Sequence, residues 1–131
     1  MKKYEILPSG KAIRATANTR AGLFTALVQG CFSAKEALAG EDSSEKVERP
    51  FSIEARDATE LLGRLLENAT ETAMKHHEVY EDVAFTFITD KKAEGHFVGR
   101  PGKPPKACRI SGNVDIAKNE EGEWDVTVKV A

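Results

Sequence analysis

The sequence predicts an α+β fold, a two-layer sandwich in which two helices pack on one face of a mixed or antiparallel sheet of about six strands. Two kinds of periodicity support this prediction. In several short stretches apolar residues alternate with polar ones, as in strands with one buried face. In two longer stretches apolar residues recur every three or four positions, as along one side of a helix. One sheet that covers both apolar stripes is the simplest arrangement.

Length and composition suit one soluble domain that spans residues 1–131. Hydrophobic residues make up 40% of the chain and charged residues 31%, and the formal net charge is −2. The chain therefore lacks the bulk charge of a polycation or polyanion. The apolar run near the N-terminus, 4–8, is too short for a signal peptide, and no apolar run is long enough to cross a bilayer. We expect a cytoplasmic protein without membrane contact.

The two cysteines, Cys31 and Cys108, are far apart in the sequence and do not have a metal-ligand spacing. Cys31 falls on the apolar stripe of a predicted helix, and Cys108 falls in a predicted strand. We interpret both as small buried apolar residues in a reducing compartment. A disulfide between them is the alternative.

The N-terminal part predicts a strand at Tyr4 to Pro8, a second strand at Ala12 to Ala17, and then a helix. Asn18 or Thr19 can cap the start of this helix, and Gly40 can end it in a left-handed conformation. The apolar stripe of the helix consists of Leu23, Phe24, Leu27, Val28, Cys31, Ala34 and Leu38.

The clearest local pattern is a strand that leads into a helix between Val47 and His77. In the strand, the apolar residues Val47, Phe51, Ile53 and Ala55 alternate with polar ones. Asp57 lies where the period changes, with Glu60 three residues later, which resembles a capping box. The stripe of the helix consists of Ala58, Leu61, Leu62, Leu65, Leu66, Ala69 and Ala73.

The C-terminal part predicts strands and turns. Val79 to Thr89 is a strand, and His96 to Val98 is its returning partner in a hairpin. Three prolines and two glycines within 99–105 predict a loop. Cys108 to Ile116 and Glu123 to Val130 are expected to close the chain as a second hairpin. One face of the last strand carries Trp124, Val126, Val128 and Val130.

No set of residues indicates catalysis, so we expect no enzymatic activity, no cofactor and no metal site. His76 and His77 are adjacent on a helix and point about 100° apart, so their imidazoles do not converge on a metal. A histidine at a helix C-terminus interacts favourably with the helix dipole instead. The segment 99–103 lacks the Walker spacing, and no serine has the setting of a nucleophile elbow.

The charge pattern indicates where a partner could bind. Between positions 91 and 109 there are six basic residues and one acidic residue, Glu94. RNA phosphates or an acidic protein surface would suit such a segment, although an ordinary solvated loop is the alternative. Phe97 is the one aromatic residue among them, which does not indicate base stacking. The candidate contacts to a partner or phosphate are Lys91, Lys92, Arg100, Lys103, Lys106 and Arg109.

Short motifs follow one another along nearly the whole chain. They are Tyr4-Glu5-Ile6-Leu7-Pro8, Ile13-Arg14-Ala15, Leu23-Phe24, Phe32, Leu61-Leu62, Lys106-Ala107 and Gly122-Glu123-Trp124. In order and spacing they resemble the archease family. This resemblance implies a compact two-layer fold. It also implies a role in assisting the GTP-dependent RNA ligase that seals tRNA halves, by promoting guanylylation and turnover of that ligase.

The archease family carries metal-binding residues that are not matched here. A His-Thr-Ala-Asp run follows the first proline in the family, where this chain has Ser9-Gly10-Lys11-Ala12. A Thr-Tyr-His run follows Lys-Ala, where this chain has Cys108-Arg109-Ile110-Ser111, and Ala131 takes the place of the terminal aspartate. A hard cation needs oxygen ligands, so we expect the fold without this metal site.

These expectations lead to two hypotheses on function. The first is a non-catalytic archease-like protein that modulates a protein partner, an RNA ligase, with at most weak or indirect contact to nucleic acid. The alternative is a structural or protein-interaction module that retains the fold without activating a ligase.

Overall fold

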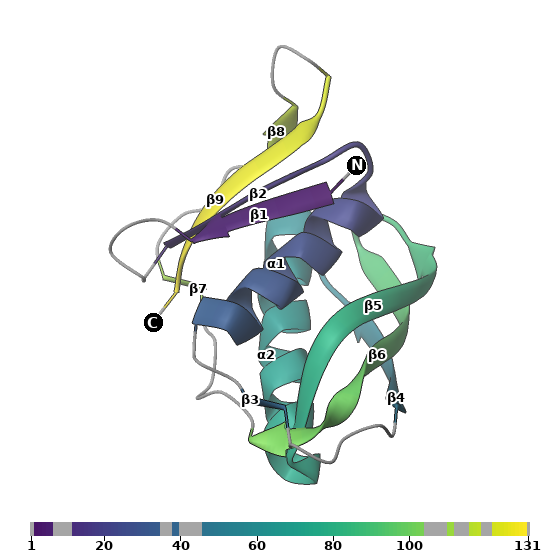
Figure 1. The fold of residues 1–131 in the computed structure, drawn as a ribbon. Helices are drawn as coiled ribbons and strands as arrows, with labels where there is room; N and C mark the ends of the chain where they lie inside the picture. Colours follow the sequence, from purple (N-terminus) through teal and green to yellow (C-terminus); the bar gives the residue numbers. More distant parts are fainter. Residues whose placement is uncertain are drawn as a thin grey trace.

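The computed structural model describes residues 2–6, 12–34, 38–39, 46–103, 110–111, 116–118 and 122–130. Within these residues, two helices and six longer antiparallel strands form the expected α+β fold (Figure 1). The strands form two separate sheets, whereas the sequence predicted one.

The first sheet joins the two ends of the chain. Its main strands are β1 (Lys2–Ile6), β2 (Ala12–Ala17) and β9 (Trp124–Val130), in the order β1–β2–β9. Two short strands, β7 (Ile110–Ser111) and β8 (Ala117–Lys118), also pair with β9. The predicted C-terminal hairpin is therefore confirmed as antiparallel pairing of these short described strands with β9.

The second sheet has a long central strand. β6 (Lys92–Lys103) lies between β4 (Val47–Glu54) and β5 (Glu78–Ile88). The short β3 (Leu38–Ala39) also pairs with β6, at its C-terminal end. In β4, Phe51 and Ile53 are buried while their neighbours are exposed, as the alternation predicted.

The loop predicted over 99–105 is wrong for residues 99–103, which belong to β6. On one side Pro101 pairs with Glu78 of β5. On the other side β4 begins opposite Gly99 and β3 ends opposite Gly102, so no described strand pairs with Pro101 there. A residue without an N–H is accommodated at such an interruption. Residues 104–105 lie outside the described part of the chain.

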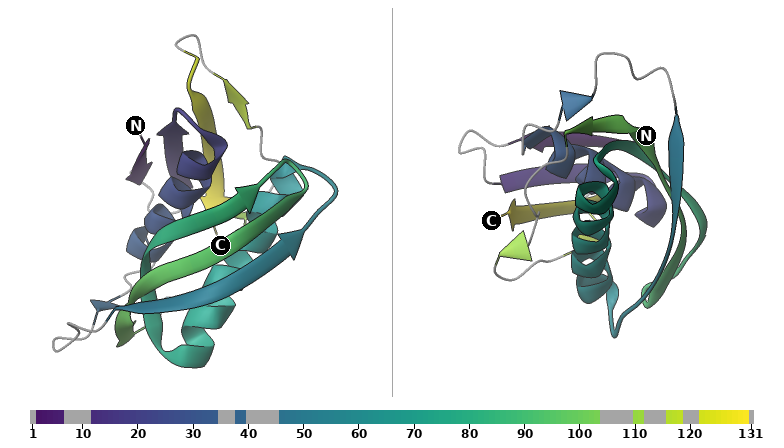
Figure 2. Two further views of the ribbon diagram at one scale, coloured as in Figure 1. Left: turned by 90° about the vertical axis from the view of Figure 1, so that its right-hand side faces the viewer. Right: turned by 90° about the horizontal axis from the view of Figure 1, so that it is seen from below.

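Two irregularities in β5 curve the β5–β6 hairpin. The register shifts between Tyr80 and Asp82, and again between Phe85 and Phe87. Glycines of β6 lie opposite these bulges. A Cβ atom at Gly99 would lie 1.9 Å from the Val79 carbonyl oxygen, and one at Gly95 would lie 2.1 Å from that of Ala84. Glycine therefore permits the close approach of the two strands, which curl around the helices (Figure 2).

Helix α1 (Arg20–Ala34) lies between the two sheets, against β1 and β2 on one side and β5 on the other (Figure 1). The Thr19 hydroxyl accepts a hydrogen bond from the Gly22 N–H at 3.0 Å, which confirms the predicted cap. All six residues from Leu23 to Val28 are buried. A single apolar stripe was therefore too narrow a prediction, because both sides of the helix are covered.

The predicted end of this helix is wrong. The described helix ends at Ala34, and Leu38 belongs to β3. Gly40, the predicted terminator, lies outside the described residues.

Helix α2 (Ala58–His76) packs on the second sheet. The Asp57 carboxylate accepts a hydrogen bond from the Glu60 N–H at 2.8 Å, as the capping pattern predicted. Its stripe from Leu61 to Ala73 is buried as expected. His77 ends the helix in a left-handed conformation, and its N–H donates to the Ala73 carbonyl. Neither described helix is long and apolar enough to cross a membrane.

Cys31 is fully buried on α1, as predicted, but it is disulfide-bonded, so the free thiol expected for a reducing compartment is wrong and the disulfide alternative applies to it. The expectation of a free thiol rested on compartment alone, and separation in sequence does not tell how close two cysteines lie in the fold. Cys108 lies outside the described residues.

Candidate functional site

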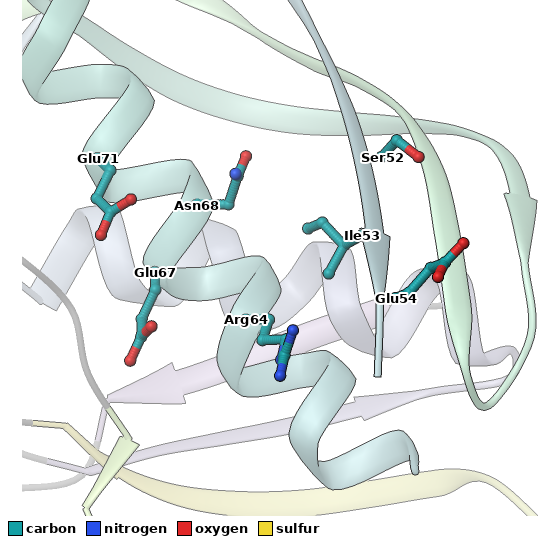
Figure 3. Close-up of a pocket in the computed structure, with 7 residues that line it drawn as sticks. All are labelled: Ser52, Ile53, Glu54, Arg64, Glu67, Asn68 and Glu71. Atoms are coloured by element: carbon teal, nitrogen blue, oxygen red, sulfur yellow. The ribbon is translucent and has the colours of Figure 1, made fainter. Parts of the chain in front are cut away.

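A shallow groove of about 270 Å³ lies between β4 and α2 (Figure 3). On the strand side it is lined by Ser52 and Glu54, which belong to the exposed phase of β4. On the helix side it is lined by polar residues that lie away from the buried stripe. The full lining is Ser52, Ile53, Glu54, Arg64, Glu67, Asn68 and Glu71.

Two of the carboxylates in this groove are uncompensated. Arg64 pairs with Glu60 at 3.0 Å, and Lys92 pairs with Glu54 at 3.6 Å. Glu67 and Glu71 form no ion pair with another described residue. The described residues contain no group of three His, Cys, Asp or Glu side chains that could hold a metal ion. The two carboxylates make the groove suitable for a surface contact with a basic group.

A buried ionic network lies where α2 gives way to β5. Arg49 donates two hydrogen bonds to the Glu78 carboxylate, at 2.8 and 2.7 Å. The Tyr80 hydroxyl donates a third to the same carboxylate, at 2.9 Å. Only 3% of the Glu78 side chain is exposed. Sequence reasoning missed this network, although Arg49 lies in the same phase of β4 as Phe51, and a cation at an inward position indicates an acidic partner.

The pKa values of Glu78 and Tyr80 are shifted in opposite directions. The two hydrogen bonds from Arg49 hold the pKa of Glu78 below its ordinary value, despite the opposing effect of burial. Burial, and then the hydrogen bond to Glu78, raise the pKa of Tyr80 far above its ordinary value. At neutral pH the carboxylate is ionised and the phenol is protonated. This arrangement stabilises the fold and is not that of a general acid or base.

Aromatic rings fill the interior beside this network. Tyr80 stacks on Phe97 at 5.3 Å between ring centroids, and Phe97 stacks on Phe51 at 4.6 Å. Phe32 of α1 meets Tyr80 edge-on at 5.5 Å, and Phe85 meets Phe51 in the same way at 5.7 Å. These contacts form a packed core and not a ligand cavity.

The predicted basic residues are spread along β6. Lys92, at one end, pairs with Glu94 at 3.3 Å as well as with Glu54, and Arg100 pairs with Glu81 at 3.3 Å. Arg100 lies eight positions after Lys92, roughly 26 Å along an extended strand. The described members therefore do not form one patch, and a role in binding a partner stays a prediction.

Among the remaining predicted residues of this segment and the histidines, those that the structure describes lie apart. Lys91 lies in the β5–β6 turn and Lys103 is the last residue of β6, while Lys106 and Arg109 lie outside the described residues. His76 ends α2, and His96 lies on the exposed face of the second sheet. The described side chains are therefore not brought together.

The outer face of the second sheet is not covered by either described helix (Figure 2). Phe87 is 47% exposed on this face. The exposed residues Pro50, His96 and Ala84 form one row across its three main strands. Phe87 pairs with Glu94 of β6, which pairs with Ser52 of β4, so Phe87 is a single exposed aromatic residue with polar neighbours across the sheet.

The comparisons with protein families and with curated proteins do not assign a function to the chain. No protein-family model matches the chain, and no curated protein matches it.

Proposed function

We propose that this chain is a non-catalytic archease-like protein that modulates a protein partner, a GTP-dependent tRNA-splicing RNA ligase. The resemblance is carried by motifs near both ends of the chain. In the fold these motifs lie on neighbouring strands, because Ala15 of β2 pairs with Val126 of β9, and Ala17 pairs with Trp124. Motifs that are far apart in the sequence are thus neighbours in the first sheet.

The observation that carries the proposal concerns the three segments in which the family has its metal ligands. Their described ends meet at one end of the first sheet. Lys129 of β9 pairs with Ala12 of β2 on one side and with Ser111 of β7 on the other. Segments that are distant in sequence come together here, as a shared metal site requires. In these segments the sequence has Lys11 and Ala131 where the family has metal ligands, and this departure is the basis for proposing the fold without the metal site.

A protein without a reactive site acts through its surface. The described surface offers an acidic groove beside α2 and basic residues along β6, of which Lys91 and Lys103 lie near the two ends of that strand. Complementary charges steer association and fix orientation more than they raise affinity. We therefore assign the basic segment 91–109 to contact with an acidic surface of the ligase.

A guanylylation assay tests this proposal. The RNA ligase encoded in the same genome is incubated with GTP and metal ion, with or without the purified protein. We expect a faster formation of ligase–GMP. An archease that carries the full ligand set is the positive control. Absence of both binding and stimulation would overturn the assignment to a ligase.

Calcium titration by calorimetry separates the metal question from the ligase question. We expect no saturable heat up to millimolar calcium, while the control archease binds. Stoichiometric binding by this chain would contradict the loss of the metal site. The ligase assay would then be repeated with calcium present.

The exposed face around Phe87 favours the second candidate function, a protein-interaction module without ligase activation. A Phe87→Ser variant leaves the core intact, since this side chain lies outside the core cluster. If this variant stimulates the ligase as the unmodified protein does, the face is not used for ligase contact. A protein captured by the unmodified chain but not by the variant would support the module.

A further inference from the structure

The only tryptophan of the chain lies between two cations that come from distant parts of the sequence. Trp124 begins β9 and pairs with Ala17 of β2 on one side and with Lys118 of β8 on the other. Helix α1 begins three residues after Ala17, so its first residue, Arg20, reaches the same corner (Figure 1). The Arg20 guanidinium carbon lies 5.2 Å from the Trp124 ring centroid, and the Lys118 ammonium lies 5.1 Å from it.

The acidic residues described at this corner do not pair with the two cations. Neither Arg20 nor Lys118 forms an ion pair with a described carboxylate. Asp125, which follows Trp124, is held by Arg14 at 2.8 Å. The first turn of α1 contains no acidic residue, although the N-terminal end of a helix favours negative charge. Two cations and a helix terminus therefore share one place next to Glu123 and Asp125, and neither cation forms an ion pair within the described part of the chain.

One donor at this place also lacks an acceptor among the described residues. The Nε atom of Arg20 is shielded from solvent and has no hydrogen-bond partner there. Buried polar groups in native proteins are almost always paired, so an unpaired one calls for an explanation. A guanidinium binds an oxyanion through two parallel N–H bonds, and the Nε–H can be one of the two.

We infer that Arg20 and Lys118, held beside Trp124, bind the phosphate group of a nucleotide or of RNA. Cation–π contact with the ring keeps both cations at one corner of the protein. The phosphate supplies a negative charge and, once the Arg20 side chain turns, an acceptor for its Nε–H. This site is distinct from the basic segment 91–109 and does not depend on a ligase partner.

Trp124 makes the site directly observable, because its emission reports this corner alone. The protein is titrated at low ionic strength with inorganic phosphate, with a mononucleotide, and with a short single-stranded RNA. Sodium chloride at matched ionic strength is the control. We expect a saturable change of Trp124 emission with phosphate and none with chloride. Tighter binding of RNA than of the mononucleotide would identify RNA as the source of the phosphate, and the reverse would identify the free nucleotide.

The Arg20→Gln variant is expected to weaken phosphate binding at least tenfold, and Lys118→Gln less. Arg14→Gln is the matched control. Arg14 lies on β2, in the same sheet as Trp124, and already has a carboxylate partner, Asp125. Circular dichroism confirms that the variants are folded. Because the Arg20 Nε is shielded, binding through it requires the side chain to turn, and its NMR signal should shift on titration. An equal response to chloride, equal affinity of Arg20→Gln, or an unchanged Nε signal at saturation would each overturn the proposal.

Discussion

Replacing Gly99 by alanine tests the close approach of β5 and β6. The added Cβ would lie 1.9 Å from the Val79 carbonyl oxygen and 2.8 Å from the Tyr80 Cα atom. Ordinary contact begins at 3.4 Å, so the strands would have to separate by about 1.5 Å, the difference between 3.4 and 1.9 Å. Both obstructing atoms belong to the backbone, which cannot turn aside as a long side chain can.

The expected loss of stability has two sources, overpacking of the interior and loss of hydrogen bonds between the strands. Overpacking in a well-packed interior costs about 1–3 kcal/mol. Loss of two ladder hydrogen bonds beside the glycine adds about 1–3 kcal/mol in net terms. We expect Gly99→Ala to lower the free energy of unfolding by about 4 kcal/mol, a large part of the stability of a small domain. Gly95→Ala should have a similar effect, because its Cβ would lie 2.1 Å from a backbone oxygen.

Urea unfolding followed by circular dichroism measures this loss, and Gly122→Ala is the control. Gly122 has φ +80, and a Cβ added there would meet nothing within 4 Å, so only backbone strain of about 1–2 kcal/mol should appear. If Gly99→Ala unfolds within about 1 kcal/mol of the unmodified protein, a difference typical of surface substitutions, the close approach of the two strands is refuted.

Three further substitutions test single contacts. Glu78→Gln should lower the free energy of unfolding by roughly 1–3 kcal/mol at neutral pH, because it removes the negative charge and replaces one of the two oxygens that accept three hydrogen bonds in this buried site with an NH2 donor. Because the pKa of Glu78 is lowered from 4.5 in the folded protein, its contribution is present above pH 4.5 and is lost as the pH falls through the folded value. The difference between the unmodified protein and Glu78→Gln, measured by urea unfolding, should therefore shrink in acid, and a constant difference would contradict the ionised pair. Asp57→Ala should cost about 1 kcal/mol by loss of the α2 cap, and thermal unfolding with no change would contradict that contact. His77→Gly should raise the midpoint temperature slightly, because glycine adopts φ +54 without strain, and a lower midpoint would show that the imidazole is needed.

Local structure could be predicted where it depends on residues that are close together in the sequence. The start of α2 depends on Asp57 and Glu60, which are neighbours in sequence, and the predicted contact is present. The inward and outward phases of β4 depend only on alternation. Even there Arg49 was overlooked, because its partner Glu78 is 29 residues away in the sequence and lies on β5, which does not pair with β4. A buried charge can be explained from its phase, but its partner has to come from the fold.

The division into two sheets was not predictable, because it depends on how far α1 is buried. A helix on one face of a single sheet needs one apolar side, and the stripe of α1 was interpreted in that way. The unbroken burial of Leu23 to Val28 shows that α1 has neighbours on both sides. The sequence contained this signal as a run of small and apolar residues, which is typical of a helix covered all round.

The end of β6 shows why composition misled at 99–103. Proline and glycine usually break a central strand, and the count of both in this segment indicated a loop. Here Gly99 serves the approach of β5, and Pro101 falls where neither β3 nor β4 lies beside the strand. Both residues are compatible with the strand because of where they fall in the strand pairing, which the sequence alone does not show.

The length of β6 also determines which basic residues lie close enough to bind one anion together. The basic residues between 91 and 109 are close in sequence, but Lys92 and Arg100 are held far apart by the extended strand, and each has an acidic partner. Arg20 and Lys118 are separated by most of the chain, yet they meet at one indole ring, and neither forms an ion pair with a described acid. Electrostatic attraction of an anion depends on distance and on the absence of a competing partner. By both criteria the corner around Trp124 is the better phosphate site, although its residues do not form a run in the sequence.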